Sequence, residues 1–103
     1  MGVKGEIMIT TKERAQLRKL AQNMDPVVQI GKGGISDAVI DSVGLVLEKR
    51  ELVKIRLLNN SGIDTDEAMD VLCSGLNADP VQKIGNILVI YKFSKKKDAK
   101  HVL

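Results

Sequence analysis

The residues best suited to binding a ligand are four consecutive positions, Gly31-Lys32-Gly33-Gly34. Three glycines let the backbone adopt conformations that other residues avoid, and they let the main chain approach a ligand closely. An apolar run at residues 27–30 precedes them and a helical pattern follows, so the start of that helix would add free N–H groups and the positive end of its dipole. Lys32 adds a positive charge. The segment is therefore predicted to hold a phosphate group.

The spacing of these glycines separates nucleotide binding from nucleic-acid binding. A dinucleotide-binding G-x-G-x-x-G motif requires glycine or alanine where Ser36 stands, and a Walker A motif requires Ser or Thr directly after Lys32, where Gly33 stands. The segment does match G-x-x-G, the pattern with which KH domains clamp a nucleic-acid backbone. Because the chain has nine glycines, such a short match also arises by chance, and a turn that binds nothing is the alternative.

Basic residues supply a second candidate surface. The net charge is +3 and unevenly distributed: residues 10–34 hold five cations and two acids, residues 83–100 six lysines and one acid, and residues 59–79 five acids and no cation. A molecule with a basic and an acidic side orients near a polyanion, although ordinary solubility is the alternative for any single charge. Outside the glycine segment, the candidates for RNA contact are Lys12, Arg14, Arg18, Lys19, Lys54 and Arg56.

Few residues could perform catalysis. His101 lies near the carboxyl end, and Cys73 has no partner that would activate it or share a metal ion. The acids at residues 64–70 do not follow the EF-hand spacing. We therefore expect no catalytic residue, metal or cofactor. An enzyme that binds a nucleotide or phosphoester at the glycine segment stays open as an alternative, although Asp37 suits the stabilisation of a first helical turn better than the role of a base.

The length of 103 residues predicts a single domain, which we place at residues 8–94. Residues 1–7 show no pattern and are set apart as a leader, and residues 95–103 are expected to form a mobile basic tail. No apolar run reaches the roughly 20 residues that span a bilayer. One cysteine cannot form an intrachain disulfide. A soluble monomer in a reducing cytoplasm, without a membrane partner, is expected.

The candidate residues must be positioned by helices and strands that the periodicity of apolar residues predicts. Helices are expected at residues 11–23, from Ser36 to about residue 50, and from the cap at Asp64 through residue 76; strands are expected at residues 27–30, 52–58, 81–84 and 87–93. Strands separated by helices should be parallel, and the last two antiparallel. The predicted fold is α/β in two layers, ordered α-β-α-β-α-β-β, with a four-stranded mixed sheet.

Four blocks of the chain resemble the CRM domain, named for chloroplast RNA splicing and ribosome maturation, and its stand-alone YhbY-type members. The blocks are LRKLA at residues 17–21, PVVQIGKGGI at 26–35, ELVKI at 51–55 and VQKIGNILVIY at 81–91. The family usually has isoleucine where Val53 stands, often a basic residue where Asp25 stands, and a basic residue or threonine near Asn86. The resemblance implies a fold like the C-terminal domain of translation initiation factor 3, with a KH-like glycine loop.

The same resemblance implies an RNA-binding protein that associates with precursors of the large ribosomal subunit. Carried onto this chain, Gly31, Lys32, Gly33 and Gly34 would clamp the RNA backbone, and the cations of the first helix would extend the contact surface. The expected function is non-enzymatic binding of structured ribosomal RNA during subunit assembly. A protein-interaction module that docks a basic partner, such as a ribosomal protein, through the acidic third helix is a further alternative.

Overall fold

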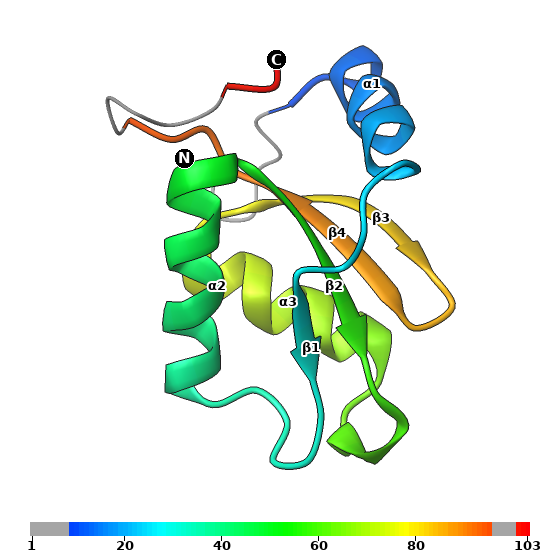
Figure 1. Cartoon of the computed structure of the whole chain (residues 1–103), viewed down its shortest axis with the longest axis vertical. Helices are drawn as coiled ribbons and strands as arrows, with labels where there is room; N and C mark the ends of the chain where they lie inside the picture. The colour runs from blue at the N-terminus through cyan, green and yellow to red at the C-terminus, as the bar shows by residue number, and fades with distance from the viewer. Residues whose placement is uncertain (1–8, 96–100) are drawn as a thin grey trace.

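A mixed sheet of four strands forms the centre of the computed structural model, which describes residues 9–95 and 101–103 (Figure 1). The strands are β1 (Val28–Ile30), β2 (Leu52–Leu57), β3 (Asp79–Ile84) and β4 (Ile87–Tyr91). β1 pairs in parallel with β2, and β4 runs antiparallel to both β2 and β3. The predicted four-stranded mixed sheet is confirmed. Its order is β1-β2-β4-β3, so the last hairpin places β4 inside the sheet and β3 at an edge.

The described residues contain three α-helices, which cover both faces of this sheet: α1 (Thr11–Ala21), α2 (Asp37–Arg50) and α3 (Thr65–Leu76). α2 and α3 share one core with sheet residues such as Ile55 and Leu88, whereas Leu17 and Ala21 of α1 share a second core with Val89. Successive strand residues point to opposite faces, so β2 and β4 supply both cores. The prediction of two layers is therefore wrong. The apolar stripe of α1 covers the sheet face that α2 and α3 leave open, which adds a third layer.

Each α-helix begins at the capping residue that the sequence predicts. The Thr10 hydroxyl accepts a hydrogen bond from the Glu13 N–H while the Glu13 carboxylate accepts one from the Thr10 N–H, a reciprocal capping box. Ser36 caps α2 and Asp64 caps α3, each through a single side-chain oxygen that accepts a hydrogen bond from the N–H three positions ahead. No helix in the described part of the chain is long and apolar enough to cross a membrane.

Four strand boundaries differ from the prediction. β1 begins at Val28 rather than at residue 27, and β2 ends at Leu57 rather than at residue 58. β3 begins at Asp79 rather than at residue 81, so Pro80 lies within the strand. Proline has no N–H to donate, but β3 is an edge strand, and an edge strand pairs with a neighbour on one side only. A register shift between Pro80 and Gln82 accompanies it. β4 ends at Tyr91 rather than at residue 93. The predicted tight turn between these strands is present, with Gly85 at a φ of +57°.

A buried carboxylate ties the end of the described chain to the sheet. Glu51, which follows α2 directly, is 0% exposed and has a φ of +65°. Its carboxylate accepts hydrogen bonds from the N–H groups of Ser94 and Val102, and the His101 ring Nδ1 lies 2.8 Å from Glu51 Oε2. We call these four residues the Glu51 clasp. His101 also stacks on Phe93, with ring centroids 5.1 Å apart.

The expectation of a mobile tail is wrong at the start of the tail and at residues 101–103, which the clasp holds. Ser94 is buried and its hydroxyl donates to the Glu48 carbonyl, and residues 101–103 return to Glu51 instead of extending into solvent. The lysines at positions 96, 97 and 100 lie outside the described residues.

Candidate nucleic-acid interface

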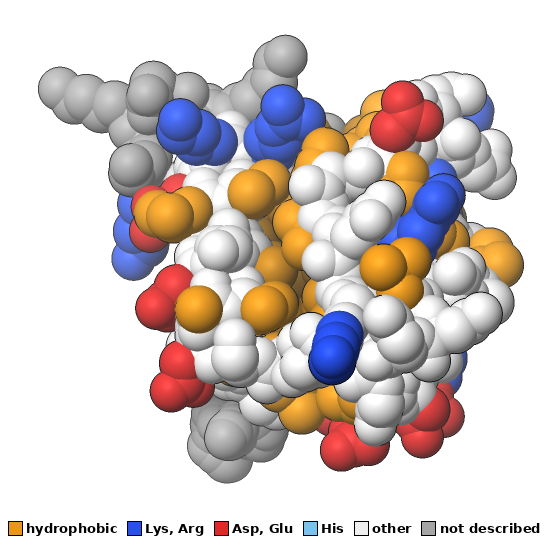
Figure 2. All heavy atoms as spheres, turned by 60° about the horizontal axis from the view of Figure 1, so that its bottom comes forward, with side chains coloured by type: hydrophobic (Ala, Val, Ile, Leu, Met, Phe, Trp, Pro, Cys, Tyr) orange, Lys and Arg blue, Asp and Glu red, His pale blue; other side chains and the backbone are white. Residues whose placement is uncertain are grey.

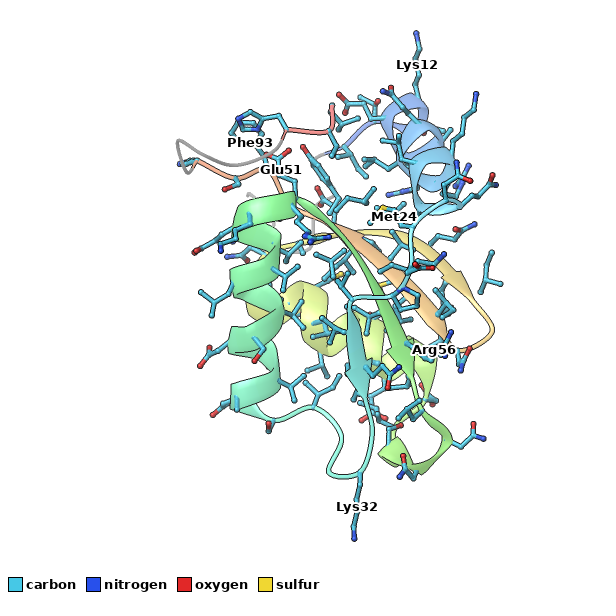
Figure 3. All side chains as sticks on the ribbon, in the orientation of Figure 1. Lys12, Met24, Lys32, Glu51, Arg56 and Phe93 are labelled. Carbon is cyan, nitrogen blue, oxygen red and sulfur yellow. The ribbon has the colours of Figure 1, made fainter. Side chains whose placement is uncertain are left out.

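The glycine loop, residues 31–34, is a turn at the end of β1 with its tip exposed. The Gly34 N–H donates to the Gly31 carbonyl at 3.0 Å, and Gly33 and Gly34 have φ values of +97° and +64°. These positive values account for the glycines, since other residues adopt them only with strain. Lys32 extends from the tip, away from the rest of the molecule (Figure 3). The loop therefore presents a cation beside accessible backbone.

The loop is not joined as directly to the start of α2 as the sequence suggests. Ile35 and Ser36 intervene, and the Ser36 hydroxyl already accepts a hydrogen bond from the Val39 N–H at 3.3 Å. Asp37, exposed in the first turn, brings a negative charge to the positive end of the helix dipole. Anion binding at this end must therefore depend mainly on Lys32 and the loop backbone.

A second turn lies against the glycine loop, and sequence reasoning missed its position. The 3-10 helix η1 (Asn59–Ser61) follows β2, and the Leu58 N–H donates to the Ile30 carbonyl at 2.8 Å, which holds the two turns together. A Cβ placed on Gly31 would lie 3.4 Å from the Asn60 side-chain oxygen. The only signal in the sequence was the composition Asn-Asn-Ser-Gly, which predicts a turn without saying what it touches.

The predicted cations do not form one continuous surface with the loop. In Figure 3, Lys12 of α1 and Lys32 of the glycine loop lie at opposite ends of the molecule, and Arg56 of β2 lies between them. Figure 2 brings the loop end toward the viewer and shows isolated cationic side chains on that face, with acidic ones at its margins. The other cations of α1 are Arg14, Arg18 and Lys19.

Lys54 has a structural role. It points to the same sheet face as α1, and its Nζ donates to the carbonyls of Ala21 and Met24, both at 3.0 Å. These carbonyls lie at the carboxyl end of α1 and just beyond it, where a positive charge is favourable. α1 ends at Ala21 rather than at the predicted residue 23, and the N–H groups of Asn23 and Met24 donate to the Leu20 and Ala21 carbonyls three positions back. The exposed Arg56, two positions along the strand, keeps its place as a candidate for RNA contact.

Arg14 and Arg18 line an open groove of about 730 Å³ between α1 and α3, along the edge strand β3. Its other wall carries Asp66 and Asp70, and Lys83 pairs with Asp66. Three cations and two acids therefore line this groove, and one of the cations is already paired with an acid.

The side chain most capable of nucleophilic chemistry is protonated in this fold. Burial, and then the nearby negative charges of Asp79 and Asp70, raise the pKa of Cys73 to about 12. A thiol with this pKa is a weak nucleophile at neutral pH. Among the residues that the structure describes, no cluster of His, Cys, Asp or Glu could hold a metal ion.

Curated proteins similar to this chain are named for RNA binding. A protein of Bacillus subtilis, named "Probable RNA-binding protein YqeI", is 40% identical over 88 residues, which cover 85% of this chain and 92% of the relative. An "RNA-binding protein" of Haemophilus influenzae is 29% identical over 87 residues, covering 84% of this chain and 88% of that protein.

The fold is also similar to a solved structure. The solution structure of the hypothetical protein SAV1595 from Staphylococcus aureus superposes with a TM-score of 0.67 at 40% identity, covering 87% of this chain and 94% of that one. The sequence-family model of the CRS1 / YhbY (CRM) domain matches residues 9–92 of this chain. With this match over most of its length, and with relatives of this identity, the chain belongs to the CRS1/YhbY (CRM) domain family.

Proposed function

We propose that this protein binds structured ribosomal RNA during assembly of the large ribosomal subunit, and that it does so without catalysing a reaction. The glycine loop, with Lys32 at its exposed tip, is the observation that carries the proposal. Its relatives named for RNA binding support RNA as the partner. In this proposal the fold acts as the C-terminal domain of translation initiation factor 3 does, and the protein works as a cytoplasmic monomer.

The loop provides the two kinds of group that a phosphate requires. Lys32 supplies charge, and the backbone N–H groups of Gly31–Gly34 that are not used within the turn supply hydrogen bonds. A side chain on Gly33 would meet no protein atom within 4 Å, so the space above this residue is open to a ligand. The backbone of an RNA strand can therefore approach the loop as it approaches the G-x-x-G loop of a KH domain.

The cations of α1 and Arg56 extend this contact in the proposal. They lie away from the loop, so one RNA must span the molecule to reach both, as a folded ribosomal RNA does. Phosphate contacts of this kind position an RNA without reading its sequence. The shape of the RNA then determines which site is bound.

Gly33→Asp tests the proposal directly. A carboxylate at this position faces the space that the phosphate would occupy, so we expect at least a hundredfold loss of affinity for ribosomal RNA. In cells, the variant should leave the fractions of a sucrose gradient that contain precursors of the large subunit. Unchanged affinity and unchanged sedimentation would refute the proposal.

Gly85→Asp is the matched control. Gly85 also has a positive φ, +57°, and also has no protein atom within 4 Å of its Cβ position, but it lies in the β3–β4 turn. This variant places the same charge on a glycine of positive φ outside the glycine loop. Circular dichroism and urea unfolding of both variants separate a loss of binding from a loss of folding.

A further inference from the structure

We infer that η1 is the second arm of the RNA-binding end, and that Asn59 and Asn60 bind the 2′-hydroxyl of a ribose next to the phosphate held by the glycine loop. This inference rests on the proposed function and names the groups that would distinguish RNA from DNA there. It starts from the contact between two turns that lie almost thirty positions apart in the chain.

The two turns form a fixed pair. A Cβ on Gly34 would lie 3.1 Å from the Ser61 carbonyl oxygen, closer than ordinary van der Waals contact, so the two backbones are packed directly against each other. Ser61 is buried, and its hydroxyl donates to the Ile63 carbonyl at 3.2 Å, which fixes the far side of η1. The backbone of η1, which carries Asn59 and Asn60, is thus packed against the loop that carries Lys32.

The side chains of this pair differ in chemistry. Lys32 can attract a phosphate, which only accepts hydrogen bonds. Asn59 and Asn60 are exposed, and their amides are uncharged and carry both donors and acceptors. A phosphate makes no use of an acceptor, whereas a 2′-hydroxyl both donates and accepts. An amide pair beside a phosphate-binding loop therefore matches the adjacent sugar of an RNA.

Aromatic stacking cannot supply this recognition at the loop end. Tyr91 is buried in the core beneath α1, and Phe93 stacks on His101 beside the Glu51 clasp, far from Lys32 (Figure 3). A polar side chain that does lie against the glycine loop is the Asn60 amide of η1.

Two hairpin RNAs test the inference. Both have the same sequence, with a paired ribose stem and a ten-nucleotide loop; in one of them the loop nucleotides are 2′-deoxy. Fluorescence anisotropy with the wild-type protein should show tighter binding of the all-ribose hairpin. For Asn59→Ala/Asn60→Ala we expect affinity for the all-ribose hairpin to fall about five- to tenfold and affinity for the deoxy-loop hairpin to stay unchanged.

Salt dependence adds a second readout. The asparagines are uncharged, so the slope of log affinity against log salt should be the same for the double variant and the wild type. Asn60→Leu keeps about the size of the side chain beside Gly31 without adding a charge, and it should also lower affinity for the all-ribose hairpin alone, which guards against misfolding of the double variant. Ser74→Ala, which removes an exposed hydroxyl from α3, is the control and should bind as the wild type does.

The outcomes are distinguishable. Equal affinity of the double variant and the wild type for the all-ribose hairpin, or an equal loss for both hairpins, would overturn the assignment of Asn59 and Asn60. If Gly33→Asp still abolishes binding of both hairpins, the proposed function stands while this inference fails. If Gly33→Asp binds normally, the proposed function itself fails.

Discussion

A positive φ occurs on both sides of α2 and serves opposite purposes there. At its amino-terminal end, Gly33 and Gly34 have positive φ values and leave polar groups open to a ligand; at its carboxyl-terminal end, Glu51 has a φ of +65° and is fully buried. Glycine adopts this conformation without strain, whereas at Glu51 the hydrogen bonds of the clasp must offset its cost. Positive φ therefore marks a binding surface only where the polar groups beside it lack partners.

Removing the carboxylate tests the buried end with the largest expected effect. Glu51→Ala leaves the Ser94 and Val102 N–H groups without their acceptor, so we expect the free energy of unfolding to fall by about 3 kcal/mol. RNA affinity at a temperature where the variant is folded should not change. Urea unfolding and anisotropy measure the two quantities. Asp41→Ala, which removes an exposed acid from α2, is the control; a loss at Glu51 no larger than that of the control would contradict the role of the clasp.

The pH dependence of stability tests whether the ionised form of the Glu51 carboxylate stabilises the fold. Burial alone would raise the pKa of Glu51, but hydrogen bonds from the Ser94 N–H, the His101 ring and the Val102 N–H, with the nearby charge of His101, lower it below its ordinary value of 4.5. A carboxyl group with a lowered pKa stabilises the fold above its unfolded pKa, and this contribution is lost as pH falls through the folded pKa. The stability difference between the wild type and Glu51→Gln should therefore shrink as the pH falls below about 4.5. A constant difference down to pH 3 would show that the charge of Glu51 contributes nothing.

Lys32→Ala tests the exposed end with an intermediate effect on binding. One lost phosphate contact should reduce RNA affinity about fivefold at moderate salt and make the slope of log affinity against log salt shallower by roughly 1. Stability should be unchanged, because the side chain extends into solvent. Lys49→Ala, which removes an exposed cation of α2 outside the proposed interface, shows whether the loss is specific to the interface. An unchanged slope in Lys32→Ala would exclude a phosphate contact at this residue.

A substitution at Lys54 has the smallest expected effect, and it tests whether this lysine stabilises the fold or contacts RNA. Lys54→Met keeps the apolar stem and removes the hydrogen bonds to the Ala21 and Met24 carbonyls, so unfolding should become easier by about 1 kcal/mol. Because the ammonium group already serves the end of α1, the salt dependence of RNA binding should stay the same. Arg56→Met, on the same face of β2, provides the contrast. It should make the slope of log affinity against log salt shallower and leave stability nearly unchanged.

What the sequence predicts well depends on short distances along the chain. The caps at Thr10, Ser36 and Asp64 are correct because each needs only residues three positions away. The glycine turn and the Gly85 hairpin are likewise local, and their backbone φ values fit the glycines found there.

What the sequence does not reveal depends on residues far apart in the chain. Glu51 follows Lys49 and Arg50 and reads as a surface acid at a helix end; only the return of residues 94, 101 and 102 makes it a buried acceptor. Lys54 reads as an exposed cation because alternation gives the face but not the helix end that lies over it. The contact between η1 and the glycine loop follows from the parallel pairing of β1 and β2, which brings the ends of both strands to one side.

The irregular edge strand β3 also has a consequence for association between copies of the chain. An open strand edge can pair with another molecule, and proline, lysine and bulges at such an edge discourage this pairing. β3 combines Pro80, the register shift beside it and the exposed Lys83, while the opposite edge, β1, is only three residues long. Neither edge offers a long regular template for strand addition. Copies of the chain at high concentration should thus resist joining into aggregates through their sheets.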